Sequence, residues 1–530
     1  MRLRHLILSS TSMGLALLGA LTSVQAQTDE SGAINLAIRA AIQSRKTSYV
    51  LPARTIYLSN SITIPAGTRN FALRGSKQGT AVTTLVPITN MGHMIVVGAN
   101  INLSNRPVVP LNNVADRARY VELTTVGASV ARGNYLLTDA TILRGSQRIR
   151  YELVQGRSFD TTRRRLTLAD AVSREFDNQA TIQNIDGQMS ENIRVESIKM
   201  DANGTGKNVD GMVIAYLVRG ITYRYLTALG FKTNGIVVEK SSRATIERCV
   251  VNALDGTTYG EGYGIQVNQS RYVAIRYCEG IGNRHTVMIC GGSTDVAVMR
   301  VTSVHVQRDR GTIDLHGSDE RRIRIEYCTA NMISLGNTHW GMGAKDVTLR
   351  AVTAPWIAFR PNVQRVTVQN SAVNRVYFEW GSDIGVRPQD PVSIDNIKFI
   401  RTVLKATYWG SPISQNNINI GRMEFLQCDF QTERWPAVSS SDGTATLTFT
   451  SCKFGTNTTN PFMVFQNPGN TGRYAVRVVG NQFTVTAAMP FAIDTKSDYI
   501  GTVTGDRNNI VIAPVGITPP LARPGVAILQ

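Results

Sequence analysis

Two arginines, two histidines and an aspartate gather around two short apolar segments near the middle of the chain. Arg284 and His285 precede the first segment, and Asp314 and His316 alternate with the apolar residues of the second, which Arg310 precedes. An arginine fork can bind a carboxylate through two parallel hydrogen bonds, and a histidine can take up a proton near neutral pH. Such a set could neutralise a sugar carboxylate and remove the proton next to it, which is the chemistry of β-elimination from a uronic acid.

These residues belong to a long repeat. An apolar-x-apolar-x-x-apolar pattern recurs about every 25 residues, and a period of this length indicates stacked structural units. Alternation inside each unit indicates strands with one buried face. We therefore predict an all-β solenoid in which the middle residues of the pattern stack in one row. Those residues are Val195, Tyr223, Ile246, Ile275, Val298, Ile325, Leu349 and Val368, and the pattern resumes at Phe399, Phe425, Phe449 and Val478.

At these repeats the chain resembles the right-handed parallel β-helix of the pectate-lyase-like superfamily. Residues 29–67 are similar to the opening of that fold, an amphipathic cap helix followed by the first coil. The resemblance implies a single-stranded right-handed parallel β-helix, a cap helix over residues 31–44 and a catalytic cleft along one face of the rod. We place the apolar stripe of the helix at Ala33, Leu36, Ala37 and Ile42.

The chain is expected to divide into five parts. Positive residues at the start, an apolar stretch and small residues before Ala26 predict a signal peptide over residues 1–26. The protein is therefore expected to be secreted, periplasmic or held at the cell surface, and no later segment has the run of about 18 apolar residues that a membrane span needs. The other parts are the cap helix and first coils at 27–116, an antiparallel β insertion at 117–187, the regular β-helix with a candidate groove at 188–380, and C-terminal coils with an extended tail at 381–530.

The first strand of each coil should carry the candidate residues on its outer face. If the apolar pairs from Met212 and Ile214 to Ile313 and Leu315 point inward, the residues between and beside them point outward. The outward rows are then Val213, Val237, Gln266, Met288 and Asp314; Ala215, Glu239, Asn268, Cys290 and His316; and Thr233, Arg284 and Arg310.

Neighbouring coils lie about 4.8 Å apart, so the candidates should share one surface patch. The predicted catalytic residues are Arg284, His285, Asp314, His316 and Arg310. Along the rod from this patch, the predicted substrate-binding residues are Glu239, Gln266, Asn268, Trp340, Trp356, Arg360 and Glu379.

The charge balance favours an anionic partner. Lysine and arginine number 56 against 38 acidic residues, which gives a formal net charge of +18. An acidic polysaccharide is the expected partner, whereas nucleic acid is not, because no concentrated basic run or nucleic-acid-binding motif is present. No metal or other cofactor is predicted, since no CxxC or Cys/His cluster occurs and the calcium-binding aspartate cluster of pectate lyases is not recognisable.

Five of the six cysteines occupy the same position in the repeat. An even number of cysteines in an exported chain would fit disulfides, but a shared inward position favours a stack of free, buried thiols. We predict buried, unbridged side chains. The residues in the shared position are Cys249, Cys278, Cys328, Cys428 and Cys452.

Three functions remain open. Hydrolysis of a glycosidic bond uses two carboxyl groups about 5–9.5 Å apart, whereas Asp314 and Glu239 are three coils, or about 14 Å, apart. Asp309, Asp319 and Glu320 lie in turns from which they could reach the patch. The paired-aspartate signature of polygalacturonase-type hydrolases is absent. A polysaccharide lyase is therefore the leading hypothesis, with a β-helix glycoside hydrolase and a non-catalytic glycan-binding or envelope protein as alternatives.

Overall fold

The structure is a computed structural model of the chain. It describes residues 27–530 apart from 101–107, 126–129, 131, 144–145, 177–178, 259, 306–310, 317–318, 337–342, 361, 379–391, 409–417, 433–437, 440–442, 457–462, 466–472, 485–492, 496–500, 506–508, 513–527 and 530. The predicted signal peptide at residues 1–26 therefore lies outside the described residues.

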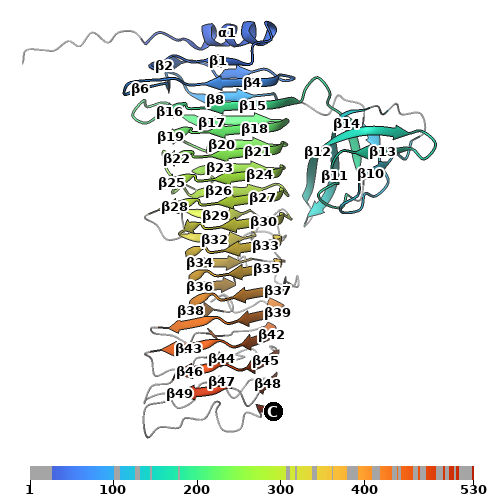
Figure 1. The fold of residues 1–530 in the computed structure, drawn as a ribbon, viewed down its shortest axis with the longest axis vertical. Coiled ribbons are helices and arrows are strands. Elements are labelled where there is room, and N and C mark those ends of the chain that lie inside the picture. The colour runs from blue at the N-terminus through green and yellow to red at the C-terminus, as the bar shows by residue number, and fades with distance from the viewer. Residues whose placement is uncertain are drawn as a thin grey trace, which may run out of the picture.

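The described residues form a rod of stacked coils in which each regular coil contains three short strands (Figure 1). One coil consists of β26 (His285–Cys290), β27 (Thr294–Met299) and β28 (Thr302–Val304). Each of these strands pairs in parallel with its equivalents in the coils before and after it. The predicted all-β parallel solenoid is confirmed.

The regular coils follow this order of first, second and third strands. The first strands are β17 (Val209–Tyr216), β20 (Asn234–Glu239), β23 (Tyr263–Asn268), β26, β29 (Thr312–Leu315) and β32 (Met332–Leu335). The second strands are β15 (Ser190–Glu196), β18 (Val218–Arg224), β21 (Ser242–Glu247), β24 (Arg271–Arg276), β27, β30 (Arg321–Glu326), β33 (Lys345–Arg350) and β35 (Gln364–Gln369). The third strands are β16 (Lys199–Asp201), β19 (Thr227–Phe231), β22 (Val250–Ala253), β25 (Glu279–Ile281), β28 and β31 (Thr329–Ala330), and β34 (Thr353–Phe359) joins a third and a first strand.

The core consists of residue rows that run along the rod. Ile246, Ile275, Val298 and Ile325 pair in successive coils and are fully buried. The predicted row is therefore confirmed. Farther along, the same row becomes aromatic in β37 (Val392–Ile400), β39 (Ile418–Leu426) and β42 (Gly443–Thr450), where stacked phenylalanine rings lie 4.8–4.9 Å apart. All six cysteines are buried and free, which confirms the prediction for the repeated position.

Helix α1 (Ser31–Gln43) covers the N-terminal end of the rod (Figure 1). Its position agrees with the prediction, but its buried face does not. Ile34, Ile38 and Ala41 are buried, whereas Leu36 is 67% exposed. The buried residues follow the i, i+4, i+7 spacing of one helix face, and the predicted stripe was rotated away from that face.

For one first strand, β17, the prediction of which residues point into the core is also wrong. In β17, Val213 and Ala215 pair with Ile236 and Val238 of the next coil, so they point inward in place of Met212 and Ile214. All the residues from Met212 to Ala215 are buried, and the alternation of burial that would have set the phase is missing. From β20 to β29 the predicted inward pairs, Ile236 and Val238 through Ile313 and Leu315, do pair with one another.

A six-stranded antiparallel sheet stands beside the rod (Figure 1) and confirms the predicted insertion. It has a core of its own, built around Val121, Leu137, Leu166, Phe176 and Ile182. Its first strand precedes residue 117, where the insertion was expected to begin. The strands are β9 (Val109–Pro110), β10 (Tyr120–Glu122), β11 (Gly133–Leu143), β12 (Ser146–Asp160), β13 (Arg165–Leu168) and β14 (Thr181–Asn184).

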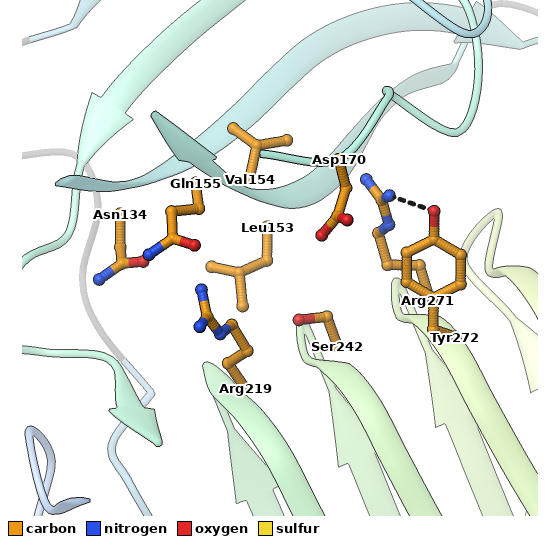
Figure 2. Close-up of a pocket in the computed structure, with 9 residues that line it drawn as sticks. All are labelled: Asn134, Leu153, Val154, Gln155, Asp170, Arg219, Ser242, Arg271 and Tyr272. Atoms are coloured by element: carbon orange, nitrogen blue, oxygen red, sulfur yellow. Dashed lines mark hydrogen bonds between the residues drawn. The ribbon is translucent and has the colours of Figure 1, made fainter. Parts of the chain in front are cut away.

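Buried charges join this insertion to the rod at the N-terminal ends of the second strands. Glu152 of β12 accepts a short hydrogen bond from Arg271 of β24 and two more from the backbone N–H and side chain of Ser173. Glu175 binds Arg321 of β30 at 2.6 Å. Figure 2 shows the hollow between Leu153 of the insertion and Arg271, which has room for about one water molecule and is too small for a sugar.

We expect Arg271→Met to loosen the insertion. The substitution leaves the Glu152 carboxylate buried without its cation, which typically costs about 3–5 kcal/mol. The matched control is Arg243→Met, because the ion pair of Arg243 with Asp170 is largely exposed and such pairs contribute about 1 kcal/mol or less. Hydrogen exchange of residues 109–184 should accelerate in the first variant only. Equal protection in both variants would show that the buried pair does not anchor the insertion.

Candidate functional site

The candidate site lies on the outer face of β23, β26 and β29. Tyr263, His285 and Thr312 pair in successive coils and form one row. Asp314 lies one row farther along, and Ser334 follows it in β32. The prediction that Arg284 occupies this row is wrong, because His285 is the residue of β26 that pairs with Tyr263 and Thr312.

A β-bulge explains this shift. The pairing of β26 with β29 skips one residue between His285 and Val287, so Thr286 is the extra residue. Asn283 fixes the start of the strand, because its side chain is fully buried and bonds both Ala253 N–H and Val251 C=O at 2.9 Å. The strand therefore begins with His285 on the outer face.

His285 is held rigidly and is neutral. Its ring stacks on Tyr263 with centroids 5.3 Å apart, and its Nδ1 makes a short hydrogen bond with Thr312 Oγ1. The residue is 8% exposed, and its Nε2 has no hydrogen-bond partner among the described residues. Burial lowers the pKa of His285 to about 3, and the nearby positive charges of Arg284 and Arg360 act in the same direction.

Asp314 and His316 form a pair at the centre of the site. The Asp314 carboxylate is buried, and its Oδ2 lies 2.6 Å from His316 Nδ1. Burial alone would raise the pKa of Asp314, but the charge that His285 carries at low pH, the hydrogen bond from His316 and the charge of Arg360 hold the pKa below its usual range. An ionised Asp314 assigns the proton of His316 to Nδ1 and leaves the lone pair on Nε2. The His316 side chain is 29% exposed, so this base is accessible.

The same three side chains could also be considered as metal ligands. One ligand atom from each of His285, Asp314 and His316 lies within 4.8 Å of the others. A tetrahedral zinc ion has bonds of about 2.0–2.2 Å, which requires ligand atoms about 3.3 Å or more apart. The Asp314–His316 contact of 2.6 Å is shorter, so this pair has the geometry of a hydrogen bond, and it would have to open to hold an ion.

The predicted substrate-binding residues on the first strands extend from the site toward the N-terminus. Glu239, Asn268 and Cys290 pair in successive coils. Gln266 Nε2 lies 3.6 Å from Cys290 Sγ. The outer face of the first strands therefore carries polar side chains over about three coils on this side of the site.

In the other direction, Trp356 follows Thr312 and Met332 in the row of His285. Arg360 Nη1 lies 3.4 Å from the carbonyl of Gly336, and Arg375 lies over the Trp356 ring at 5.3 Å. Three predicted residues, Arg310, Trp340 and Glu379, lie outside the described residues.

Two residues of the site were missed from the sequence, and one acidic candidate, Asp319, is excluded from it. Tyr263 and Thr312 hold His285, and an alignment of first strands that allowed for the bulge would have found them. Asp319 does not reach the site, because it pairs with Arg321, Lys345 and Arg174 and so belongs to the junction with the insertion. Glu320 accepts the backbone N–H of Gly292, just after β26, and lies close enough to Cys290 to interact with it electrostatically.

No protein-family model and no curated protein matches the sequence. Solved structures do share its architecture. The tailspike gp49 from Pseudomonas phage LKA1 superposes with a TM-score of 0.51 at 13% identity, over 92% of this chain and 76% of that one. The tailspike Gp54 of Acinetobacter baumannii bacteriophage AP22, in complex with A. baumannii capsular saccharide, superposes with a TM-score of 0.55 at 12% identity, over 94% of this chain and 75% of that one. The tailspike gp61 of Pseudomonas phage phi297 superposes with a TM-score of 0.51 at 10% identity, over 84% of this chain and 72% of that one.

The chain shares the parallel β-helix fold of these tailspikes. At these identities the likeness concerns the fold alone, and the site of this β-helix chain has to be judged from its own residues. No helix among the described residues is long and apolar enough to cross a membrane.

The burial of His285 predicts a pH dependence of stability. Since its folded-state pKa of about 3 lies below the ordinary 6.5, the unfolded chain takes up the proton first as the pH falls. The contribution of the neutral His285 to the free energy of unfolding is complete above pH 6.5, and it is lost at about 1.4 kcal/mol per pH unit between pH 6.5 and 3. Between pH 7 and pH 5, urea unfolding should therefore show a smaller decline in the free energy of unfolding for His285→Gln than for the wild type. Equal declines would contradict the assignment.

Proposed function

We propose that this β-helix protein cleaves an acidic polysaccharide by β-elimination. The observation that carries the proposal is the His316–Asp314 pair, in which a buried carboxylate orients an accessible imidazole. Arg284 and Arg360 add positive charge around His285, whose ring lies 6.1 Å from that of His316. The net charge of +18 favours an anionic substrate. The AP22 tailspike, which shares the fold, was solved with a capsular saccharide, and this supports the choice of a glycan at the level of analogy.

The carboxyl groups of the described site favour elimination over hydrolysis. Hydrolysis by the usual routes needs two carboxyl groups about 5–9.5 Å apart. Among the described residues of the patch, Asp314 is bonded to His316, and Glu239 is three coils away along its row, or about 14 Å. Asp319 is paired with Arg174 of the insertion, and Glu320 accepts the backbone N–H of Gly292. The described site therefore offers one base and its orienting carboxylate.

The proposed reaction uses each group once. An arginine binds the uronate carboxylate and makes the proton on C5 more acidic. His316 Nε2 takes that proton, and the electron pair of the C5–H bond forms the C4–C5 double bond. The C4–O bond breaks with its electron pair on oxygen, and the imidazolium of His316 gives its proton to this oxygen. Asp314 stabilises the imidazolium between the two transfers.

The test is a screen of the purified protein against uronate polymers, with neutral dextran as the control. The unsaturated product absorbs in the ultraviolet, so cleavage is followed directly. We expect absorbance to rise with at least one uronate polymer and with or without a chelator. Cleavage without new absorbance would indicate a hydrolase, and binding without cleavage would indicate a non-catalytic glycan-binding protein.

A further inference from the structure

A line of large side chains follows a corner of the rod that is remote from the candidate site. In successive coils, the residue just after the second strand has a left-handed backbone with φ of 53–56°. Its N–H bonds the next coil, as in Tyr277 N to Met299 O at 3.0 Å. These side chains therefore lie about one strand spacing, or about 4.8 Å, apart. The Tyr-Arg ladder, as we name it, consists of Tyr225, Arg248, Tyr277, Arg300 and Tyr327.

Rings and guanidinium groups alternate along this ladder. The Arg248 guanidinium carbon lies 5.6 Å from the ring centroid of Tyr225 and 5.9 Å from that of Tyr277. Arg300 lies 5.5 Å from Tyr277 and 5.8 Å from Tyr327. These contacts align the side chains by cation–π attraction, yet the three tyrosines remain 42–50% exposed. The ladder is thus an ordered and accessible aromatic surface.

The turn itself does not require these residue types. Equivalent left-handed positions in other coils hold the smaller residues Ser197, Ala351, Asn370 and Ser451 as well as Arg401 and Gln427. A bulky side chain in this conformation is unusual, and the backbone bond to the next coil forms with alanine as well, as in Ala351 N to Gln369 O at 3.0 Å. The concentration of tyrosine and arginine in five consecutive coils therefore points to a role beyond the turn.

The arginines of the ladder keep their charge available. Within the part of the chain that the structure describes, neither Arg248 nor Arg300 forms an ion pair, in contrast to Arg271 and Arg321 at the insertion. The neighbouring Arg276 and Arg350 are also exposed. The adjacent acidic residues are Glu247, which is paired with Arg224 at 3.3 Å, and Glu279 and Glu326, against the four arginines Arg248, Arg276, Arg300 and Arg350. The surface around the ladder therefore complements a negatively charged partner.

No described segment covers the ladder. The insertion contacts the N-terminal ends of the second strands, through residues such as Arg271 and Arg321, whereas the ladder lies just beyond their C-terminal ends. A six-residue strand separates the two by about 20 Å. The candidate site lies on the first strands, on another side of the coil.

We propose that the Tyr-Arg ladder binds an extended acidic polysaccharide along the axis of the rod. Tyrosine rings recur at every second coil, or about 10 Å, which is comparable to the disaccharide repeat of an extended β-linked chain. Each ring can stack on the apolar face of a sugar, and the arginines between them can bind carboxylate or sulfate groups. The class of polymer rests on the proposed function, but the residues are separate from the candidate site.

Affinity electrophoresis in gels containing polygalacturonate or alginate tests the ladder. We expect the triple variant Tyr225→Ala, Tyr277→Ala, Tyr327→Ala to bind about tenfold or more weakly than the wild type. Tyr120→Ala is the aromatic control, because Tyr120 is similarly exposed but lies on the insertion. Arg248→Gln with Arg300→Gln should also lose affinity. Arg39→Gln with Arg477→Gln is the matched control for net charge.

A footprint on the wild-type protein avoids any effect of substitution on folding. Bound polymer should protect Tyr225, Tyr277 and Tyr327, but not Tyr120, from hydroxyl-radical oxidation. Unprotected ladder tyrosines, or protection by poly-dT in place of the polysaccharides, would overturn the proposal. The variant His316→Ala distinguishes the ladder proposal from the proposed function. If this variant binds polymer through the ladder and neither it nor the wild type cleaves polymer, the ladder proposal is supported and the lyase proposal is wrong. If the wild type cleaves polymer and the ladder variants bind it as well as the wild type does, the ladder proposal is wrong.

Discussion

Replacing His316 by alanine is expected to slow cleavage of a uronate polymer by about 10²–10⁴-fold, the usual contribution of a positioned general base. The residue is partly exposed on the outer face of the rod, so its loss removes the base without opening the core. The melting temperature should stay close to that of the wild type. Initial rates and thermal unfolding of the same preparation measure both effects.

Thr367→Ala is the control for this variant, because Thr367 lies on the outer face of β35, away from the site. It should keep both rate and melting temperature. Full activity of His316→Ala would move the site elsewhere. Unfolding of His316→Ala would show instead that the Asp314–His316 pair is a structural contact.

Asp314→Asn should lower the rate of cleavage nearly as much as His316→Ala does, for a different reason. The amide can donate a hydrogen bond to His316 Nδ1, which would leave the ring proton on Nε2 and remove the lone pair that faces the substrate. The same exchange in a serine protease triad lowers the rate by about 10⁴-fold, and we expect a loss of at least about 10²-fold. In the proposed reaction Asp314 is a positioning residue, and the dependence of rate on pH measures this role.

The pH profile distinguishes orientation from packing. If Asp314 fixes the His316 tautomer, the asparagine variant should change the shape of the profile, because the charge that favours the imidazolium is lost. If the substitution only disturbed packing around Asp314, it would lower the rate by the same factor at every pH. An unchanged profile would therefore contradict the assigned role. Asp314→Glu, which restores the carboxylate, should recover part of the rate.

The fold was largely predictable from the sequence because the second strands carry a strict alternation. Ile246, Ile275 and Val298 follow one another at intervals of 29 and 23 residues, and each is buried in the structure. Where burial does not alternate, the prediction failed. Residues Met212–Ala215 are all buried, and the stripe of α1 was assigned to Leu36, whereas Ile34 and Ile38 are buried.

The site was predictable in part. Asp314 and His316 follow the regular strand period, and the structure brings them within hydrogen-bond distance. The environment of His285 was not predictable, because it depends on a bulge that Asn283 fixes through contacts with the preceding coil. The involvement of Asp319 with the insertion likewise depends on long-range packing. The Tyr-Arg ladder was visible in the sequence only as scattered residues, and it becomes a line once the coils are stacked.

Cleavage in heavy-oxygen water tests the central claim most directly. In β-elimination the C4–O bond breaks and no water oxygen enters either product, whereas hydrolysis places one water oxygen in the product. We predict that mass spectrometry of the products of a uronate polymer will show unsaturated ends and no heavy oxygen introduced by the cleavage itself. Saturated products that carry one heavy oxygen for each broken bond would contradict the lyase and make the protein a hydrolase.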